Sequence, residues 1–192
     1  VDYPMLPDAK PLQQAQYVGK ALAVAQHDAA QWGGDATKFV LMGHSAGAHL
    51  VSLISAEPSL ALSQGAQPWL GTVALDSAAF DVTTIMQSRH ARLYDEAFGS
   101  DPADWNAASP IRQLQAKIAP FLAVCSSQRR NSCNQARAFA ARAQGFGSRV
   151  QVLPEDLRHG EINAELGEPS AYTASVDAFL ASIDPTLAAR LH

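Results

Sequence analysis

Four short apolar runs recur along the chain, and each is of the kind that a parallel strand covered on both faces requires. They lie at residues 39–42, 71–76, 120–125 and 149–153. Stretches with apolar residues at helical spacing alternate with these runs, at residues 12–32, 46–55, 134–144 and 170–183. Because strands alternate with helices, the pattern predicts right-handed crossovers and an α/β fold, a mostly parallel sheet with helices on both faces.

The segments between these elements carry less regular patterns. Residues 1–3 look like the tail of a strand, residues 154–167 are expected to form a loop, and Ser132 is a candidate N-cap for the helix after it. Residues 83–114 are irregular and partly helical. Because loops at the carboxyl edge of such a sheet usually contact the ligand, this insertion is a candidate cap. A plain crossover helix with a decorated loop is the alternative.

Length and charge narrow the class of protein. The 192 residues predict a single domain over 1–192, or part of a larger one. Hydrophobic residues make up 47 %, enough for a core, and the formal net charge is −4. Arg129 and Arg130 form only a pair, so no nucleic-acid partner is predicted. No apolar run approaches the ~18 residues of a membrane-spanning helix, so no membrane span is predicted either.

The two cysteines, Cys125 and Cys133, stand at the two ends of the segment 126–132. A disulfide between them would staple this segment and imply an oxidising compartment, which favours a periplasmic or secreted protein. The alternative is that Cys125 is a small buried residue at a strand end and Cys133 is incidental.

The most informative motif is Gly43-His44-Ser45-Ala46-Gly47, which joins the first apolar run to the helical stretch after it. It fits G-x-S-x-G, in which a strained turn between strand and helix holds the serine hydroxyl clear of the sheet. The backbones on either side are expected to pass so closely that a Cβ at Gly43 or Gly47 would clash. Ser45 is therefore the candidate nucleophile, and the backbone N–H of Ala46 is a candidate oxyanion-hole donor.

A serine nucleophile needs a base to take its proton and a third group to orient that base. In folds built around this motif the base follows the last strand, which selects His159. His44 belongs to the motif itself, and His49, one helical turn later, is expected to be a hydrogen-bonded core histidine. The other histidines lie on the first helix, in the insertion and at the end of the chain: His27, His90 and His192.

The orienting acid is less clear, because the segment after the third strand contains no Asp or Glu, and Asn131 is its nearest analogue. Asp76 ends the second strand and is the first candidate, since a carboxylate there can reach the same histidine from a neighbouring strand. A strand-end residue that only caps the following turn is the alternative for Asp76. Asp81 is a weaker candidate.

Several segments together resemble the esterase/lipase branch of the α/β-hydrolase family. Residues 1–7 are similar to its N-Y-R-L-x-P stretch, residues 34–50 are similar to its elbow sequence, and residues 108–110 and 159–163 also match. The chain is similar to the carboxylesterase group with feruloyl esterase-like and kynurenine formamidase-like enzymes. Residues 75–78, Leu-Asp-Ser-Ala, resemble the segment that bears the acid in pancreatic-type lipases.

The resemblance implies a serine hydrolase that cleaves small-molecule carboxylic esters through an acyl-enzyme, without metal or organic cofactor. In the family, the early strands and a His-Gly-Gly oxyanion loop lie before the point at which this chain begins. This chain has no such loop, so a non-catalytic hydrolase-fold protein that binds a ligand is one alternative. An amidase of the formamidase type is a second.

Overall fold

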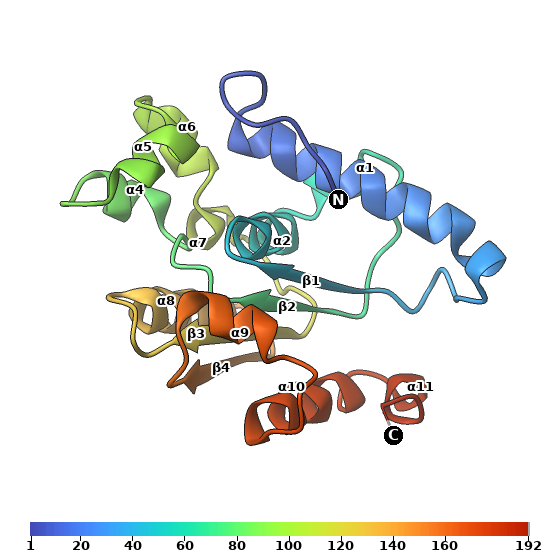
Figure 1. The fold of residues 1–192 in the computed structure, drawn as a ribbon. Coiled ribbons are helices and arrows are strands. Elements are labelled where there is room, and N and C mark those ends of the chain that lie inside the picture. The colour runs from blue at the N-terminus through green and yellow to red at the C-terminus, as the bar shows by residue number, and fades with distance from the viewer. Residues whose placement is uncertain (192) are drawn as a thin grey trace.

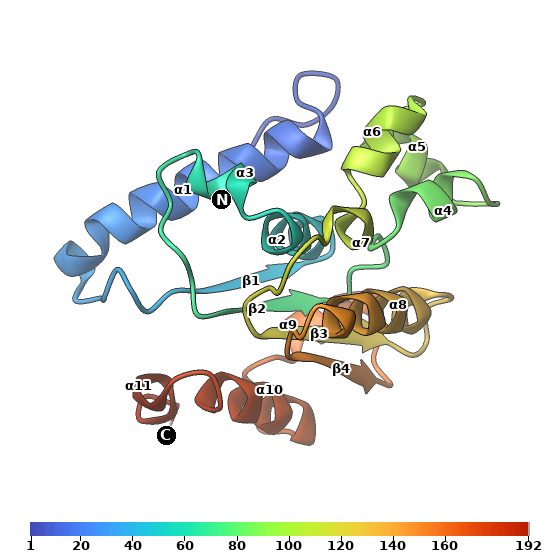
Figure 2. The same cartoon turned by 180° about the vertical axis from the view of Figure 1, so that it is seen from behind.

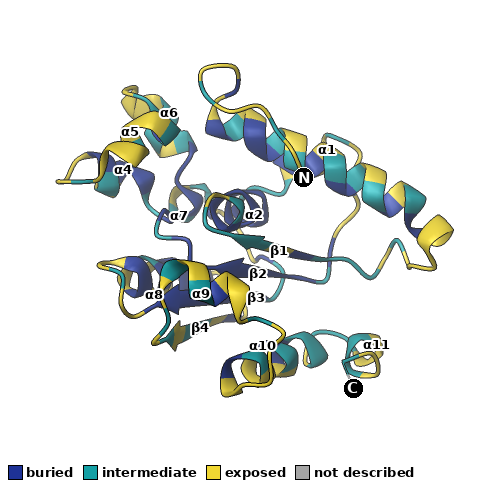
Figure 3. Cartoon of the chain, in the orientation of Figure 1, coloured by how far each residue is buried: buried dark blue, intermediate teal, exposed yellow. Residues whose placement is uncertain are grey.

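The computed structural model describes residues 1–191 and contains one sheet of four strands in the order β1-β2-β3-β4, with every neighbouring pair parallel. The strands are β1 (Val40–His44), β2 (Gly71–Leu75), β3 (Phe121–Ser126) and β4 (Val150–Glu155). All residues of β2 and β3 are buried, as a sheet covered on both faces requires (Figure 3). The predicted fold class, a parallel α/β sheet, is confirmed.

Helices connect the strands and lie on both faces of the sheet. In chain order they are α1 (Pro11–Asp28), η1 (Ala29–Trp32), α2 (Ala46–Ala56), α3 (Ser59–Leu62), α4 (Val82–Met86), α5 (Arg92–Phe98), α6 (Pro102–Ala107), α7 (Pro110–Gln113), α8 (Ser132–Gly145), α9 (His159–Ala164), α10 (Ala171–Ala181) and α11 (Pro185–Ala188). Among residues 1–191, none of these helices combines the length and the apolar character needed to cross a membrane.

Alternating side chains of the central strands divide the core between the two faces. Ala74 of β2 and Phe121 of β3 belong to the cluster with α2 and α8, whereas Val73 and Leu122 belong to the cluster with α9 and α10. Figures 1 and 2 show α8 and α9 on opposite sides of the strands. α1 and α3 add a further layer that packs on α2, where Leu50 and Ile54 are buried.

Several predicted boundaries are corrected. Residues 1–3 form no strand. The first helix ends at Asp28 and continues as one 3₁₀ turn, after which Gly33 at φ 73° stops it in the left-handed region. The predicted loop 154–167 instead contains the end of β4 and all of α9, because strand and helix extend further than the apolar pattern indicated.

The predicted insertion is resolved into four short helices, α4 to α7, which lie beside the carboxyl ends of the strands (Figure 1). They have an apolar cluster of their own, in which Val82, Met86 and Phe98 are buried. Pro102 and Pro110 each occupy the first turn of a helix, where the missing N–H costs nothing. The segment is therefore an ordered layer rather than an irregular loop.

Candidate active site

The elbow is the turn between β1 and α2. Ser45 has φ 57° and ψ −116°, a strained backbone for a residue with a side chain, and α2 begins at the next residue. A Cβ at Gly43 would lie 2.5 Å from the carbonyl carbon and oxygen of Gly47. The predicted steric requirement therefore holds at Gly43. It is wrong at Gly47, where a Cβ would meet nothing within 4 Å because that bond points into open space.

Ser45, His159 and Asp76 form a continuous chain of side-chain contacts. Nε2 of His159 lies 2.9 Å from Oγ of Ser45, and its Nδ1 lies 2.7 Å from Oδ2 of Asp76. His159 is the first residue of α9, Asp76 directly follows β2, and Ser45 directly follows β1. Because parallel strands end at one edge of the sheet, residues up to 114 positions apart meet there.

Asp76 is fully buried and accepts four hydrogen bonds from side chains and backbone. Oδ1 accepts from the N–H of Ser126 at 2.8 Å and from the hydroxyl of Ser132 at 2.6 Å. Oδ2 accepts from Nη1 of Arg129 and from His159, both at 2.7 Å. Burial by itself raises the pKa of this carboxyl, but the four donors outweigh it and hold the pKa below its ordinary value. Asp76 is thus kept as a carboxylate.

The backbone at Asp76 is in the left-handed region, with φ 56°. Asp is among the few residues with a side chain that adopt this conformation readily. The carboxylate faces the end of β3 and the start of α8, where Ser126 and Ser132 donate to it. The position of the Asp76 carboxylate therefore depends on two strand ends, that of β2 and that of the neighbouring β3.

Three of the donors to Asp76 lie between the end of β3 and the start of α8: Ser126, Arg129 and Ser132. A disulfide of 2.11 Å joins Cys125 to Cys133 across this segment, as one of the two readings of the cysteines predicted. Ser132 is not the N-cap of α8 but its first residue, because its hydroxyl donates to Asp76 instead of capping the helix.

The sequence pattern did not predict Arg129 as part of the site. Its Nη1 also donates to the backbone carbonyl of Asp76 at 3.0 Å and lies 3.0 Å from Nδ1 of His159. A buried carboxylate requires charge-assisted donors, and an arginine at the end of the adjacent strand was the available signal.

The other two candidates for the orienting group, Asn131 and Asp81, form no hydrogen bond with His159. Asn131 is exposed at the start of α8, at φ 67°, and forms no hydrogen bond with the histidine. Asp81 caps α4 through the N–H of Thr84 and pairs with Arg112 at 2.9 Å. Within residues 1–191, the group hydrogen-bonded to Nδ1 of His159 is thus a carboxylate from the second strand rather than the amide.

Two further histidines surround the site. His44 Nε2 donates to the backbone carbonyl of His159 at 2.8 Å, and the two rings lie 4.4 Å apart. His49 is buried and donates to the carbonyl of Ala108 at 2.7 Å, in agreement with its prediction as a hydrogen-bonded core histidine. Burial lowers the pKa of His49 to about 4, so this imidazole is neutral.

The remaining histidines do not contribute to this cluster. His27 contacts Asp28 on α1, and His90 contacts Asp95 on α5. His192 lies outside the described residues. Within residues 1–191 there is also no group of three or more His, Cys, Asp or Glu side chains that could hold a metal ion.

A cavity of about 200 Å³ opens above Ser45 and is bordered by Ala46 and His159. We call it the serine cavity. Leu93, Tyr94 and other residues of α5 form part of its wall. The backbone N–H of Ala46, at the first position of α2, therefore lies beside the space where a reacting carbonyl would sit.

The arrangement can activate the Ser45 hydroxyl. With Asp76 ionised, the proton of neutral His159 resides on Nδ1 and is donated to the carboxylate. Nε2 is then the acceptor that faces the hydroxyl of Ser45. A serine, a histidine and a carboxylate in this order constitute the donor–acceptor chain of a nucleophilic hydrolase.

Comparison with known proteins identifies the fold family. A family model for the alpha/beta hydrolase fold matches residues 1–160. No curated protein matches the chain. Similar solved structures include esterase 2 of Thermogutta terrifontis in several forms.

The form phosphoramylated by tabun has 22 % identity and a TM-score of 0.70, with 92 % of this chain and 66 % of that one covered. The apo form has 22 % identity and a TM-score of 0.71, with coverages of 93 % and 68 %. The butyrate-bound form has 22 % identity and a TM-score of 0.68, with coverages of 92 % and 67 %.

The chain spans about two thirds of the length of these structures, from 66 % to 68 %. At 22 % identity the likeness shows the fold alone. The family model, in contrast, matches most of the chain, residues 1–160 of 192. The protein therefore belongs to the alpha/beta hydrolase fold family.

Proposed function

We propose that the protein is a serine carboxylesterase in which Ser45 is the nucleophile, His159 the general base and Asp76 the group that orients the base. The observation that carries the proposal is the continuous contact chain, 2.9 Å from Ser45 to His159 and 2.7 Å from His159 to Asp76. These are hydrogen-bond distances of a base already aligned with its nucleophile.

In the first half of the reaction, Nε2 of His159 takes the hydroxyl proton while Oγ of Ser45 attacks the ester carbonyl. The tetrahedral oxyanion is stabilised by the N–H of Ala46, and the carboxylate of Asp76 stabilises the imidazolium. The imidazolium then protonates the leaving alkoxide. An alcohol departs, and the acyl group remains on Ser45.

In the second half, a water molecule replaces the alcohol. His159 takes one proton from it, the hydroxide attacks the acyl carbonyl, and the bond to Oγ breaks with return of the proton to Ser45. A carboxylic acid leaves and the free enzyme is restored.

The Thermogutta terrifontis structures support the proposal through what they have bound. That esterase is found phosphoramylated by tabun and, in another form, with butyrate bound. Covalent organophosphate modification is the behaviour of an activated nucleophile, and butyrate is the acid product of a short-chain ester. The serine cavity here, of about 200 Å³, suits a short acyl group.

Two further features fit the proposal. Five residues of α5 line the serine cavity, which supports residues 83–114 as a cap that contacts the substrate: Leu93, Tyr94, Glu96, Ala97 and Phe98. The disulfide between Cys125 and Cys133 supports an oxidising compartment, in the periplasm or outside the cell.

The test is labelling and turnover of the full-length protein. We expect a fluorophosphonate probe to label Ser45 stoichiometrically. Ser45→Ala should lose the label and at least about 10³-fold in kcat on p-nitrophenyl acetate. Ser175→Ala, an exposed serine of α10, is the matched control and should retain both. Equal hydrolysis by Ser45→Ala and wild type would refute the proposal, and absence of labelling would favour a non-catalytic binding protein.

An amidase would use the same three side chains, so ester and amide substrates must be compared directly. We expect kcat/KM to be larger on an aryl ester than on N-formylkynurenine, because an amine is a poorer leaving group than a phenol. The reverse ranking would assign the site to an amidase of the formamidase type.

A further inference from the structure

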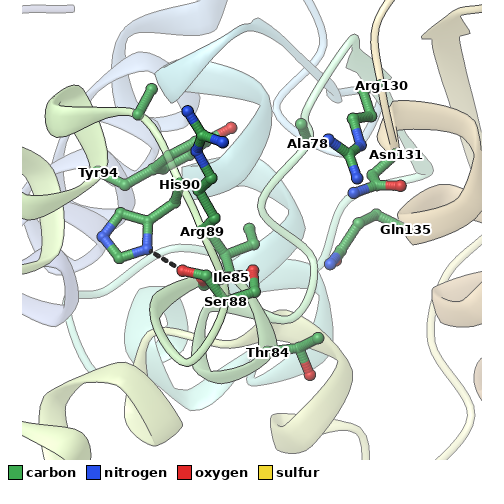
Figure 4. A pocket seen from close by; sticks show the side chains of 11 residues that line it. Ala78, Thr84, Ile85, Ser88, Arg89, His90, Tyr94, Arg130, Asn131 and Gln135 are labelled. Carbon is green, nitrogen blue, oxygen red and sulfur yellow. Dashed lines mark hydrogen bonds between the residues drawn. The ribbon is translucent and has the colours of Figure 1, made fainter.

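A second cavity, of about 690 Å³, adjoins the serine cavity. The two share Ala78 and Tyr94 in their walls, so they are neighbouring cavities that meet at these residues. Figure 4 shows Arg89, His90 and Tyr94 on one side and Arg130, Asn131 and Gln135 on the other. We call it the arginine cavity.

The side chains that line the arginine cavity have an excess of positive charge. They include the guanidinium groups of Arg89 and Arg130 but no Asp or Glu side chain. Five of the other polar members carry no charged group: Thr84, Ser88, Tyr94, Asn131 and Gln135. The whole chain carries 18 acidic and 14 basic residues, so a wall with two arginines and no acid is a local departure from the charge of the protein.

Neither arginine has a partner that accounts for its position. Among residues 1–191, the side chains of Arg89 and Arg130 form no hydrogen bond and no ion pair, and both residues are exposed. The neighbouring Arg129, by contrast, is held by Asp76 at 2.7 Å. Two guanidinium groups from separate segments therefore face a shared space with their donors free.

His90 is not a hydrogen-bond partner of either arginine, because both of its ring nitrogens have other contacts. Its Nδ1 donates to the backbone carbonyl of Ser88 at 2.7 Å, the dashed contact in Figure 4, and its Nε2 contacts Asp95 at 3.0 Å. Asp95 is not part of the cavity wall and is occupied by this histidine. The free positive charge of the cavity is thus that of the two arginines.

We infer that the arginine cavity is a subsite for a carboxylate on the substrate, so that the preferred ester bears a negative charge on the half of the molecule that passes Ala78 and Tyr94. Guanidinium groups bind carboxylates through paired, charge-assisted hydrogen bonds, and side-chain amides such as those of Asn131 and Gln135 add donors. The cavity lies within the size range of ligand sites. This inference rests on the proposed ester hydrolysis.

The test uses two pairs of esters that differ only in charge. On the acyl side, mono-p-nitrophenyl glutarate is compared with p-nitrophenyl pentanoate. On the alcohol side, 4-acetoxybenzoate is compared with 4-methylphenyl acetate. We expect Arg89→Gln/Arg130→Gln to lower kcat/KM on the anionic member of one pair by about 10-fold or more, while the neutral member changes less than about twofold.

The pair that responds identifies the half of the ester that occupies the cavity. Arg137→Gln is the control for position: it removes one arginine charge from α8, outside the cavity wall, and should leave both ratios unchanged. If the ratio of anionic to neutral kcat/KM is unchanged by the double variant in both pairs, the inference is wrong.

Equilibrium binding separates this failure from failure of the proposed function. Ser45→Ala protein is titrated with mono-p-nitrophenyl glutarate and 4-acetoxybenzoate in a calorimeter, with and without the two arginine substitutions. Weaker binding of one probe in the arginine variant supports the subsite whether or not the wild type turns over. Release of p-nitrophenol or 4-hydroxybenzoate by Ser45→Ala would refute Ser45 as nucleophile and leave the kcat/KM ratios to decide on the subsite.

Discussion

Nη1 of Arg129 lies 2.7 Å from Oδ2 of Asp76, the same oxygen that accepts the hydrogen bond from His159. One buried oxygen thus serves a fixed cation and the candidate base at once. The carboxylate is completely buried, whereas the arginine side chain is 30 % exposed, so the ion pair extends from the interior to the surface. The pair keeps Asp76 charged in a place where an unpaired carboxylate would be costly.

Replacing the arginine should therefore destabilise the protein in a pH-dependent way. We expect Arg129→Gln to lower the free energy of unfolding by about 1–3 kcal/mol at pH 7, because the buried carboxylate loses a charged donor. The folded pKa of Asp76 is below its unfolded value, so its contribution is present above about pH 4 and is lost as pH falls through the folded pKa. Urea unfolding should show the difference between variant and wild type shrinking below about pH 4.

A lysine at the same position provides the control for charge. Arg129→Lys keeps a cation but loses the planar fork, so it should recover only part of the stability lost in Arg129→Gln. Equal stability of all three proteins at pH 7 would contradict the importance of the pair.

Replacing each of two aspartates in turn tests which group orients His159. Asp76→Asn keeps the shape but presents an amide to Nδ1 of His159, and we expect kcat on p-nitrophenyl acetate to fall by about 10³- to 10⁴-fold. Asp81→Asn removes the same charge from a cap that contacts Thr84 and Arg112 instead, so kcat should change less than about threefold. A comparable loss in both variants would show that Asp76 has no special role.

The buried histidine should make stability rise with pH. Burial lowers the folded pKa of His49 to about 4, below its ordinary value of about 6.5. Between these values the unfolded chain binds the proton and the folded chain does not, so stability is lost as pH falls, by on the order of 3 kcal/mol over the full range.

A neutral donor in place of His49 should remove this dependence. His49→Gln can still donate to the carbonyl of Ala108, and every other histidine is common to both proteins. Urea unfolding from pH 7.5 to 4.5 should give a shallower loss for the variant than for wild type. Identical pH slopes would show that His49 is not buried in its neutral form.

The two glycines of the elbow should differ in their tolerance of a methyl group. Gly43→Ala would place a Cβ 2.5 Å from backbone atoms of Gly47, which cannot move without distorting the turn, so we expect a loss above about 3 kcal/mol or no folded protein. Gly47→Ala meets open space in the first turn of α2 and should lie within about 1 kcal/mol of wild type. Thermal denaturation followed by circular dichroism compares them, and equal losses would contradict the steric asymmetry.

The local pattern of the sequence was enough to predict the parallel α/β sheet, the turn between strand and helix at Ser45, and His159 as the candidate base, which lies beside Ser45 in the structure. The reason is that strand runs, helical spacing and the G-x-S-x-G turn depend on neighbours within a few residues, and chain order then selects the histidine. The boundaries of the helices and strands were predicted less accurately. The helix that starts at His159 lies in a stretch predicted as a loop, since its only buried residue is Ile162.

Tertiary structure alone decided which groups surround His159. From the sequence, Asp76 and Asn131 were both candidates for the orienting group, because each follows a strand. The sequence pattern does not determine where either side chain points. The parallel register of β2 with β3 brings Asp76 beside Ser126, Arg129 and Ser132, while Asn131 is left exposed. The sequence also did not predict the open space at Gly47 or the cavity that contains Arg89 and Arg130. Both depend on how segments distant in the chain are placed, and the sheet determines that placement.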